Sequence, residues 1–390
     1  MLIASGATPN VTELNRMAAR FAPTPIRADA SKLSAGDRKA LGKLVAAARV
    51  LNSIYMDQLW SGNRAMAREL EKDSSGIGKA RLDYFWLNKG PWSDLDGHEA
   101  FVPNAPAHKP AGANFYPEDL TKDEFEKWSK GLAEKDRKAA QGFFSVIRRD
   151  PGTKALKTVM YSEAYKKDLD QCAKLLREAA ALTDNSTLKR FLETRAAAFA
   201  SNDYYESDVA WMDLDAPIDI TIGPYETYTD ELFGYKAAFE AYVNIRDDVE
   251  TAKVKFFSDH LQDVENSLPI DAKYKNPKLG ASAPIRVVNE VIATGDAAHG
   301  VQTAAYNLPN DEKVILEKGS KRVMLKNVQE AKFEKTLVPI SRVVLHYKMG
   351  LPRLGENRVA RAVLEGLERA AAAIVPRALW AYVVVCGRKP

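Results

Sequence analysis

Two asparagines bracket a leucine–proline pair in YNLPNDEK, residues 306–313. An asparagine side chain both donates and accepts hydrogen bonds, so Asn307 and Asn310 can pair with the backbone of a bound peptide. Pro309 restricts the chain between them and removes one competing N–H group. The same residue types are typical of an ordinary turn, and their spacing alone leaves both interpretations open.

A second stretch, IGPYETYTDELFGYKAAFEAYV (residues 222–243), places a run of tyrosines and acids between two glycines. An amphipathic pattern follows. The stretch reads either as a strand that runs into a helix or as one wall of a binding site.

Other residue types that perform catalysis or bind metals are present but form no known motif. No two of the five histidines lie four positions apart, so the sequence contains no HExxH zinc helix. We interpret the His98–Glu99 pair as a surface feature and His299 as part of a turn. Cys172 lies in a helical apolar stripe, which predicts a buried, inert thiol. The two cysteines form neither a disulfide framework nor a CxxC metal site.

The acids of DYYESDVAWMDLDAPID, residues 203–219, form the densest carboxylate cluster. Oxygen-rich clusters can hold Ca²⁺ or Mg²⁺, but this spacing matches no EF-hand loop. Apolar residues separate the acids, and we therefore assign them capping and surface roles. Signatures of serine nucleophiles and of phosphate-binding loops are absent as well.

The composition bounds the class of protein. A chain of 390 residues suggests two or three domains or two lobes, at roughly 100–200 residues per domain. The net charge of +4 is spread among mixed signs, which argues against a nucleic-acid partner. No run reaches the ~18 apolar residues of a membrane span, and the N-terminus lacks a signal peptide. We expect a cytoplasmic protein, with export possible if the true start lies upstream.

The first half of the chain has mostly helical periodicity. Ser34 and Asp37 predict the start of a long helix, and Thr121 with Glu124 predicts a capping box. Residues 84–119, rich in Pro, Gly and aromatics, predict a long irregular connection. Residues 162–200 predict two helices, the second capped by Ser186.

The period changes in the second half. Alternation in PIDITIG predicts a strand over 217–223, and residues 284–292 predict another. Residues 314–325 resemble a hairpin that turns at 318–320. Residues 236–268 have helical periodicity. The expected fold class is therefore α+β and largely helical.

Several long stretches, taken together, resemble the dipeptidyl peptidase III family of zinc metallopeptidases. They are most similar to its bacterial and plant branch, some of whose members are fused to Nudix domains. The stretches that carry the resemblance are NKGPWSDLDG (88–97), GANFYPEDLT (112–121), REAAALTDNSTLKRFLETRA (177–196), SNDYYESDVAWMDLD (201–215), IGPYETYTDELFGYKAAFEA (222–241) and NLPND (307–311). The likeness runs from about Asn15 to Leu345, in the family's order.

The resemblance implies a two-lobed protein that binds short peptides by adding a strand to a sheet edge. The lower lobe would hold a small β-barrel or sheet, and an incomplete upper lobe would be helical. We expect residues 1–237 to form the helical part of the lower lobe and the first barrel strands. Residues 238–284 would cross to the upper lobe. The remaining barrel strands and the hairpin would follow in 285–335, and 336–390 would begin the upper lobe and a divergent tail.

The same resemblance assigns a substrate-binding set. Asn307 and Asn310 match the pair that contacts the substrate backbone and amino terminus in the family, and Tyr225, Glu226 and Tyr228 would lie near the cleft. Glu226 could neutralise a peptide's α-amino group, and a structural use of that carboxylate fits equally well.

One departure from the family is severe. Its zinc is held by an H-E-x-x-G-H or H-E-x-x-H helix and a later glutamate, and the glutamate inside the motif is the general base. Neither form occurs after TLVPISRVVL (336–345), where an arginine- and alanine-rich tail begins. We interpret the tail as a truncation or a frameshift, with a genuinely divergent end as the alternative.

The function expected from the sequence is that of a dipeptidyl peptidase III-like zinc-dependent exopeptidase, inactive as this chain stands. No catalytic residue, metal ligand or bound zinc is expected, although the family uses zinc. The alternative is a non-catalytic peptide-binding module that uses the barrel edge with Asn307 and Asn310. Apolar faces within 239–261 and in the tail would favour self-association.

Overall fold

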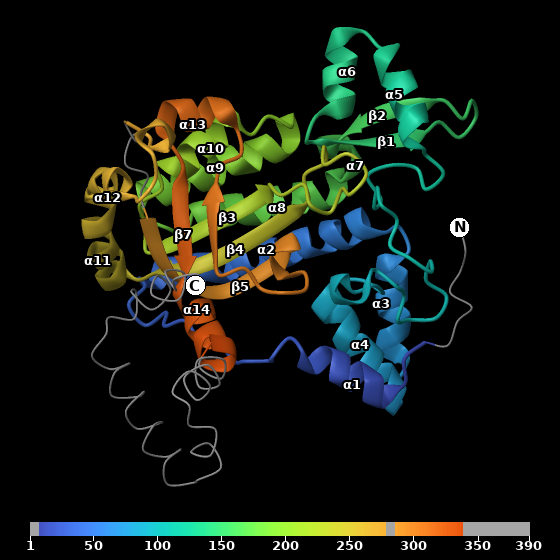
Figure 1. The fold of residues 1–390 in the computed structure, drawn as a ribbon, viewed down its shortest axis with the longest axis horizontal. Helices are drawn as coiled ribbons and strands as arrows, with labels where there is room; N and C mark the ends of the chain where they lie inside the picture. The colour runs from blue at the N-terminus through green and yellow to red at the C-terminus, as the bar shows by residue number, and fades with distance from the viewer. Residues whose placement is uncertain (1–7, 278–284, 338–390) are drawn as a thin grey trace.

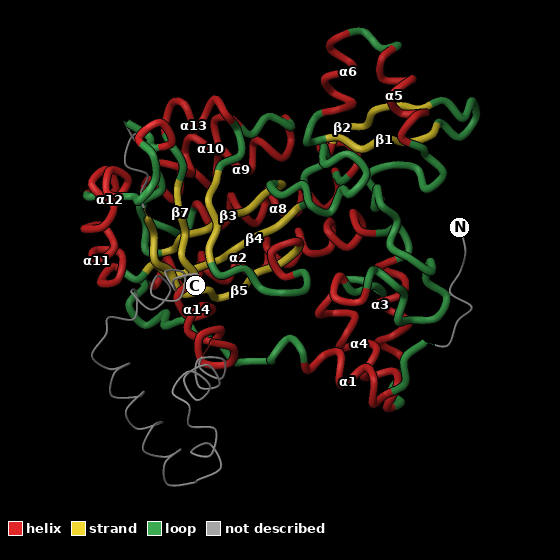
Figure 2. The backbone as a smooth tube through the Cα atoms, viewed as in Figure 1, coloured by secondary structure: helices red, strands yellow, loops and turns green. Residues whose placement is uncertain are grey.

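The computed structural model describes residues 8–277 and 285–337. Figure 1 shows a central sheet with helices packed around it, and Figure 2 shows that helices dominate the described chain. The elements that precede the central sheet are α1 (Val11–Ala19), α2 (Ala35–Leu59), α3 (Asn63–Lys72), α4 (Gly76–Asn88), the 3-10 helix η1 (Asp94–Asp96), α5 (Lys122–Lys130), α6 (Glu134–Gln141), β1 (Ser145–Arg149), β2 (Leu156–Met160), α7 (Tyr161–Ala164), α8 (Lys166–Ala180), α9 (Ser186–Ser201) and α10 (Tyr205–Met212).

The central sheet and the elements between its strands follow. They are β3 (Ile218–Pro224), β4 (Phe239–Arg246), α11 (Asp248–Asp259), α12 (Leu261–Ser267), η2 (Ala272–Tyr274), β5 (Ile285–Gly295), η3 (Asp296–Ala298), β6 (Ala305–Leu308), α13 (Glu312–Lys318), β7 (Lys321–Leu325), α14 (Lys326–Lys332) and a π-helical turn, η4 (Phe333–Leu337). The fold is α+β, as the sequence predicts.

Helix α2 begins where the sequence predicts it. The Ser34 side chain accepts a hydrogen bond from the backbone N–H of Asp37 at 3.0 Å, which satisfies one free donor of the first turn. Its apolar stripe is fully buried, including Leu44, Leu51 and Ile54. The helix packs against β4, β5 and α8, and so it forms the layer beneath the sheet (Figure 1).

The central sheet is mixed, with strand order β3-β4-β5-β7-β6. Pairing is antiparallel between β3 and β4, between β4 and β5 and between β6 and β7, whereas β5 and β7 are parallel. The two edge strands approach each other, because the hydroxyls of Thr221 (β3) and Tyr306 (β6) lie 2.9 Å apart. No backbone ladder joins them in the described chain, so the sheet is curled but open and the expected barrel is not closed.

The prediction of a helix from residue 236 onward is wrong in its first part. Residues 239–246 form β4, which pairs with β3 on one side and β5 on the other. Seven of its eight residues are buried, so it lacks the alternation that marks a half-exposed strand. The stretch quoted above is therefore a strand, a loop and a second strand, and the helices begin only at Asp248.

The predicted hairpin over 314–325 is also wrong. Residues 312–318 form α13, because the Asp311 side chain accepts hydrogen bonds from the N–H groups of Lys313 and Val314. The helix ends at Gly319, whose φ of 78° suits glycine, and β7 follows. Helix α9 is capped by Asn185 rather than by the predicted Ser186, which is its first helical residue.

The long connection predicted over 84–119 begins five residues later than expected, because Tyr84–Asn88 form the end of α4. The rest is irregular apart from η1. Its aromatic side chains Trp92, Phe101, Phe115 and Tyr116 are buried, which explains how a segment with little regular structure keeps a fixed path.

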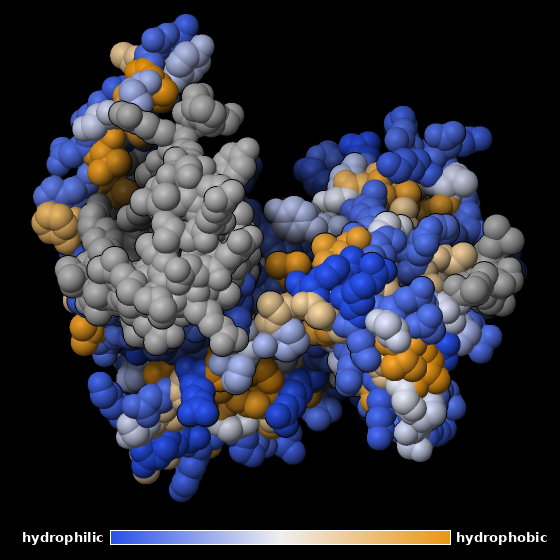
Figure 3. Space-filling view, turned by 60° about the horizontal axis from the view of Figure 1, so that its bottom comes forward, coloured by the Kyte–Doolittle hydropathy of each residue, from blue (hydrophilic) through white to orange (hydrophobic). Residues whose placement is uncertain are grey.

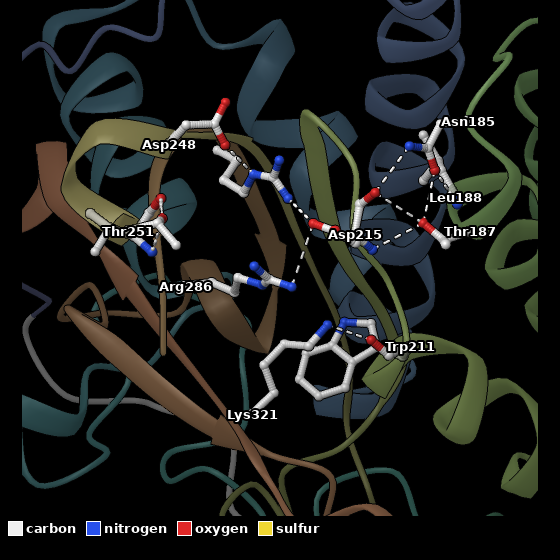
Figure 4. A network of polar contacts seen from close by, with 11 residues as sticks. Asn185, Thr187, Leu188, Trp211, Asp215, Asp248, Thr251, Arg286 and Lys321 are labelled. Carbon is white, nitrogen blue, oxygen red and sulfur yellow. Dashed lines mark hydrogen bonds and ion pairs between the residues drawn. The ribbon is translucent and has the colours of Figure 1, made fainter. Parts of the chain in front are cut away.

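The acidic stretch 203–219 departs in part from the predicted capping and surface roles, because Asp208 and Asp219 are buried, at 7% and 2% exposed. Asp215 is the centre of one network, shown in Figure 4, in which its carboxylate meets Arg246 and lies 3.6 Å from Arg286. The backbone carbonyl of Asp215 accepts hydrogen bonds from Asn185 and Thr187 at the start of α9. The network therefore joins α9, the loop before β3 and the far end of β4.

Cys172 is fully buried, and burial raises the pKa of its thiol. The prediction of an inert thiol is confirmed in this sense. No helix of the described residues is long and apolar enough to cross a membrane.

The exposed apolar side chains come later in the sequence than expected. Residues 239–245 are buried in β4, whereas α11, α12 and the segment after them expose Val249, Phe256, Val264, Ile270 and Tyr274 at 46–68%. Hydrophobic side chains lie among polar ones at the left end of Figure 3, the end at which Figure 1 places these helices. The predicted apolar tail lies outside the described residues.

We expect this surface to cause concentration-dependent self-association, because contiguous exposed apolar area is unfavourable in water. Light scattering over a dilution series should show the mass falling toward that of a monomer. Val249→Glu with Val264→Glu should shift the equilibrium to monomer, while Leu316→Glu, at an 88% exposed site on α13, should not. A monomer at every concentration would count against the prediction.

Glu290 on β5 gives the sheet a pH-dependent stability. Burial raises the pKa of its carboxyl to about 7, whereas the unfolded chain releases this proton near pH ~4.3. The folded form therefore keeps the proton that the unfolded form has lost, and stability falls as pH rises from about 4.5 to about 7. We expect Glu290→Gln to raise the unfolding free energy by roughly 2–3 kcal/mol at pH 8 and to change it little at pH 4.5.

Urea denaturation at the two pH values measures this difference. Glu193→Gln, at an exposed position of α9, is the matched control and should be neutral at both. Equal effects of Glu290→Gln at pH 4.5 and pH 8 would contradict the assignment.

Candidate peptide-binding site

The two asparagines lie at the open edge of the sheet. Asn307 is an exposed residue of β6, which has a strand neighbour, β7, on one side within the described sheet. Leu308 and Pro309 are joined by a cis peptide bond, and Asn310 follows. The backbone groups on the open side of an edge strand can pair with an added strand.

Asn310 joins this edge to the end of β3. Its Nδ2 donates a hydrogen bond to the carbonyl oxygen of Tyr225 at 3.0 Å. The Tyr225 N–H in turn donates to Ala238 at 3.1 Å, and the Ala238 N–H donates to the carbonyl of Glu226 at 2.8 Å. The predicted site residues Asn310, Tyr225 and Glu226 are thus brought together through backbone contacts.

The exposure of the predicted residues separates their roles. The Tyr225 ring is buried, with 6% of the residue exposed, and it cannot reach a ligand without movement. Glu226 is half-buried, and Tyr228, 81% exposed, extends into solvent from the same segment. Of the predicted set, Asn307, Asn310, Glu226 and Tyr228 are therefore accessible, while the buried Tyr225 contacts Asn310 through its carbonyl.

Two further carboxylates lie near Glu226 and were missed in the sequence. Glu240 of β4 is 2% exposed, and burial raises its pKa well above the usual value, with Asp296 and Glu226 adding to the rise. Burial also raises the pKa of Glu226, and Asp296 adds to it. An approaching cation would relieve this repulsion, which makes the end of the sheet suited to an amino group. The only signal in the sequence was an acid inside the apolar run FEAYV.

A glycine on each neighbouring strand lies opposite Glu240. In the register of the sheet, Gly223 of β3 and Gly295 of β5 are its partners. A Cβ at Gly295 would lie 2.1 Å from the carbonyl oxygen of Phe239, so no larger residue fits there.

Two of the histidines, His98 and His299, lie beside this end of the sheet. His98 is half-buried rather than on the surface as predicted, and its Nε2 lies 3.0 Å from Asp94. His299 Nδ1 lies 3.8 Å from the same carboxylate, and burial lowers its pKa. The Tyr55 hydroxyl and Asp296 both hydrogen-bond to Thr229, which connects these loops to the carboxylates.

Within 8–277 and 285–337, no group of three or more His, Cys, Asp or Glu side chains could hold a metal ion. These described residues thus do not fit a zinc site. The sequence-based predictions for residues 338–390, including a truncated or frameshifted zinc motif, lie outside the described residues.

The fold matches two solved structures of dipeptidyl-peptidase III. The described structure superposes on a dipeptidyl-peptidase III from Corallococcus sp. strain EGB with a TM-score of 0.81 and 54% sequence identity, over 86% of this chain and 62% of that one. It superposes on DPP III from Caldithrix abyssi with a TM-score of 0.80 and 48% identity, over 84% and 62%.

Two further comparisons agree. Residues 145–343 match Peptidase family M49, and the chain belongs to this family. It is also 43% identical over 380 residues to Nudix hydrolase 3 of Arabidopsis thaliana. The aligned region covers 85% of this chain and 49% of that protein. The chain thus spans about half of that curated relative and 62% of each solved structure. The sequence-based resemblance is confirmed at the level of the family.

Proposed function

We propose that this chain provides the peptide-binding part of a dipeptidyl peptidase III-like zinc exopeptidase and binds short peptides in extended form along β6. The observation that carries the proposal is the Asn310–Tyr225 hydrogen bond. It fixes the open edge of β6 next to the segment that bears Glu226 and Tyr228. Main-chain pairing supplies affinity that does not depend on the peptide's sequence.

The amino terminus of the peptide would lie toward Glu226, Glu240 and Asp296. The half-buried Glu226 and Asp296 supply negative charge there, so a free α-amino group binds more tightly than an acetylated one. Asn307, exposed on the edge strand, would donate to and accept from the peptide backbone. Hydrolysis requires a zinc motif, which the sequence of this chain does not contain.

We expect Asn307→Ala and Asn310→Ala each to weaken binding of a short synthetic peptide with a free amino terminus about tenfold, the loss of one hydrogen bond. Fluorescence anisotropy with a label at the peptide's C-terminus measures the dissociation constant. Asn266→Ala, at an exposed site on α12, is the matched control and should bind like the parent. Acetylation of the peptide should weaken binding to the parent as well.

Binding that is insensitive to both asparagines and to acetylation would refute this mode. Release of dipeptides by the purified chain together with stoichiometric zinc would instead show that the chain is a complete enzyme. Both outcomes differ from the weakened binding that we expect of the two asparagine variants.

A further inference from the structure

A buried arginine lies under the end of β3. Arg195 of α9 is fully buried, and its Nη2 lies 2.5 Å from the carboxylate of Asp208 on α10. Three aromatic rings surround the guanidinium, with centroids 5.4 Å (Phe191), 5.3 Å (Tyr204) and 5.5 Å (Tyr225) from its Cζ. Helices α9 and α10 are thereby joined around one charged group.

The guanidinium also touches the strand itself. Gly223 has a φ of 154°, and a Cβ there would lie 2.6 Å from Nη1 of Arg195. The side chain therefore lies against the backbone of β3 two residues before Tyr225 and against the Tyr225 ring. Tyr225 is the residue whose carbonyl accepts the Asn310 amide.

Stability alone does not explain a charge at this position. Burying an ion pair costs several kcal/mol in desolvation, and apolar residues of similar volume are often as stable or more so. Two nitrogens of Arg195, Nε and Nη1, have no hydrogen-bond partner among the described residues. What the planar, paired guanidinium adds is orientation, because it meets a carboxylate, three rings and a strand in one fixed geometry.

We propose that Arg195 is a positioning residue for the peptide-binding edge: paired with Asp208, it fixes Gly223 and Tyr225 so that the Tyr225 carbonyl meets Asn310. The effect of Arg195 on peptide affinity acts through Asn310 and therefore rests on the proposed function. The effect of Arg195 on the hydrogen bond of the Asn310 amide does not require a peptide.

The test is a double-mutant cycle. Arg195→Met with Asp208→Asn removes both buried charges at similar volume and should weaken peptide binding about tenfold. Asn310→Ala should do the same, and the combination of all three substitutions should be hardly weaker than either alone, since both act through one hydrogen bond. Additive losses of about a hundredfold would overturn the proposal, as would unchanged affinity.

A second readout needs no peptide. In the parent, the side-chain amide of Asn310, assigned by its loss in Asn310→Ala, should exchange more slowly than an asparagine amide without a hydrogen bond, because its Nδ2 donates to the Tyr225 carbonyl. In the Arg195→Met/Asp208→Asn variant it should exchange at the rate of an asparagine without that bond. If the parent binds no peptide but this change occurs, the proposed function fails and the positioning role stands. If the exchange rate is unchanged, the positioning role fails.

Two variants separate positioning from packing. Phe191→Leu alters the same cage on the side of α9 and should lower thermal stability without changing the Asn310 amide or peptide affinity. Arg195→Lys keeps the charge but not the planar fork, and should restore stability better than it restores affinity. It also replaces the methionine variant should that fail to fold. If Phe191→Leu weakened peptide binding as much as Arg195→Met/Asp208→Asn does, the role of Arg195 would be packing and not positioning.

Discussion

Replacing Asp208 with alanine is expected to lower the unfolding free energy by about 3–5 kcal/mol, because it leaves the Arg195 charge buried without a counterion. The pair is inaccessible, with 0% of the Arg195 side chain and 10% of the Asp208 side chain exposed. Solvent therefore cannot compensate for the loss. Urea denaturation at pH 7 with an unchanged m-value measures the effect.

Asp213→Ala is the control for this change. Asp213 also pairs with cations, Arg190 and Lys318, but its side chain is 39% exposed. Exposed pairs contribute less than about 1 kcal/mol, so this variant should stay close to the parent. Similar losses in both variants would show that burial of Arg195 is not the cause.

Replacing Asp230 with alanine should cost about 4 kcal/mol and also abolish tight peptide binding. Asp230 is 2% exposed, and it accepts a hydrogen bond from the Tyr116 hydroxyl at 2.8 Å. It also accepts from the backbone N–H groups of Leu232, Phe233, Tyr235 and Lys236. These bonds fix the loop between β3 and β4, and Tyr228 lies at the start of that loop.

Graded variants make this prediction specific. Tyr116→Phe removes one of the bonds and should cost about 1 kcal/mol. Glu134→Ala is the control at a surface ion pair, because its partner Lys138 and Glu134 itself have side chains 75% and 69% exposed, and it should cost less than about 1 kcal/mol. Thermal and urea denaturation give the order of stabilities, and an Asp230→Ala protein as stable as the Glu134→Ala protein would contradict it.

The sequence predicts the helices with capping signals well. Ser34 and the stripe of α2 are local features, and the structure keeps them. The sequence predicted a helix where β4 lies, because burial of the strand on both faces removes the alternation on which strand prediction depends. Only its pairing with β3 and β5, far apart in the chain, settles its conformation. The wrong prediction of a hairpin over 314–325 has another cause. Asp311 is a local capping signal that precedes α13, and the prediction did not use it.

For the candidate site, the resemblance to a family predicted which residues take part, and the structure shows which of them are in contact. Asn310 and Tyr225 are 85 positions apart, and no spacing rule predicts that one side chain meets the other's carbonyl. Glu240 and Asp296 were missed because acids acquire their electrostatic effect from neighbours that tertiary structure brings close. Whether Asn307 contacts a peptide stays a prediction.

The path between β4 and β5 has an evolutionary consequence. The chain leaves the sheet after Arg246 and re-enters it in β5, which begins at Ile285 and places Val288 opposite Arg246. The Asp247 N–H donates to the Val287 carbonyl at 2.9 Å. Everything between these points is an insertion into a hairpin whose two ends already meet. Such a position accepts additional sequence at small entropic cost, since the ends are held together by the strands. The sheet can thus carry inserted sequence between β4 and β5, while β6, two strands away from β5, keeps its own pairing with β7.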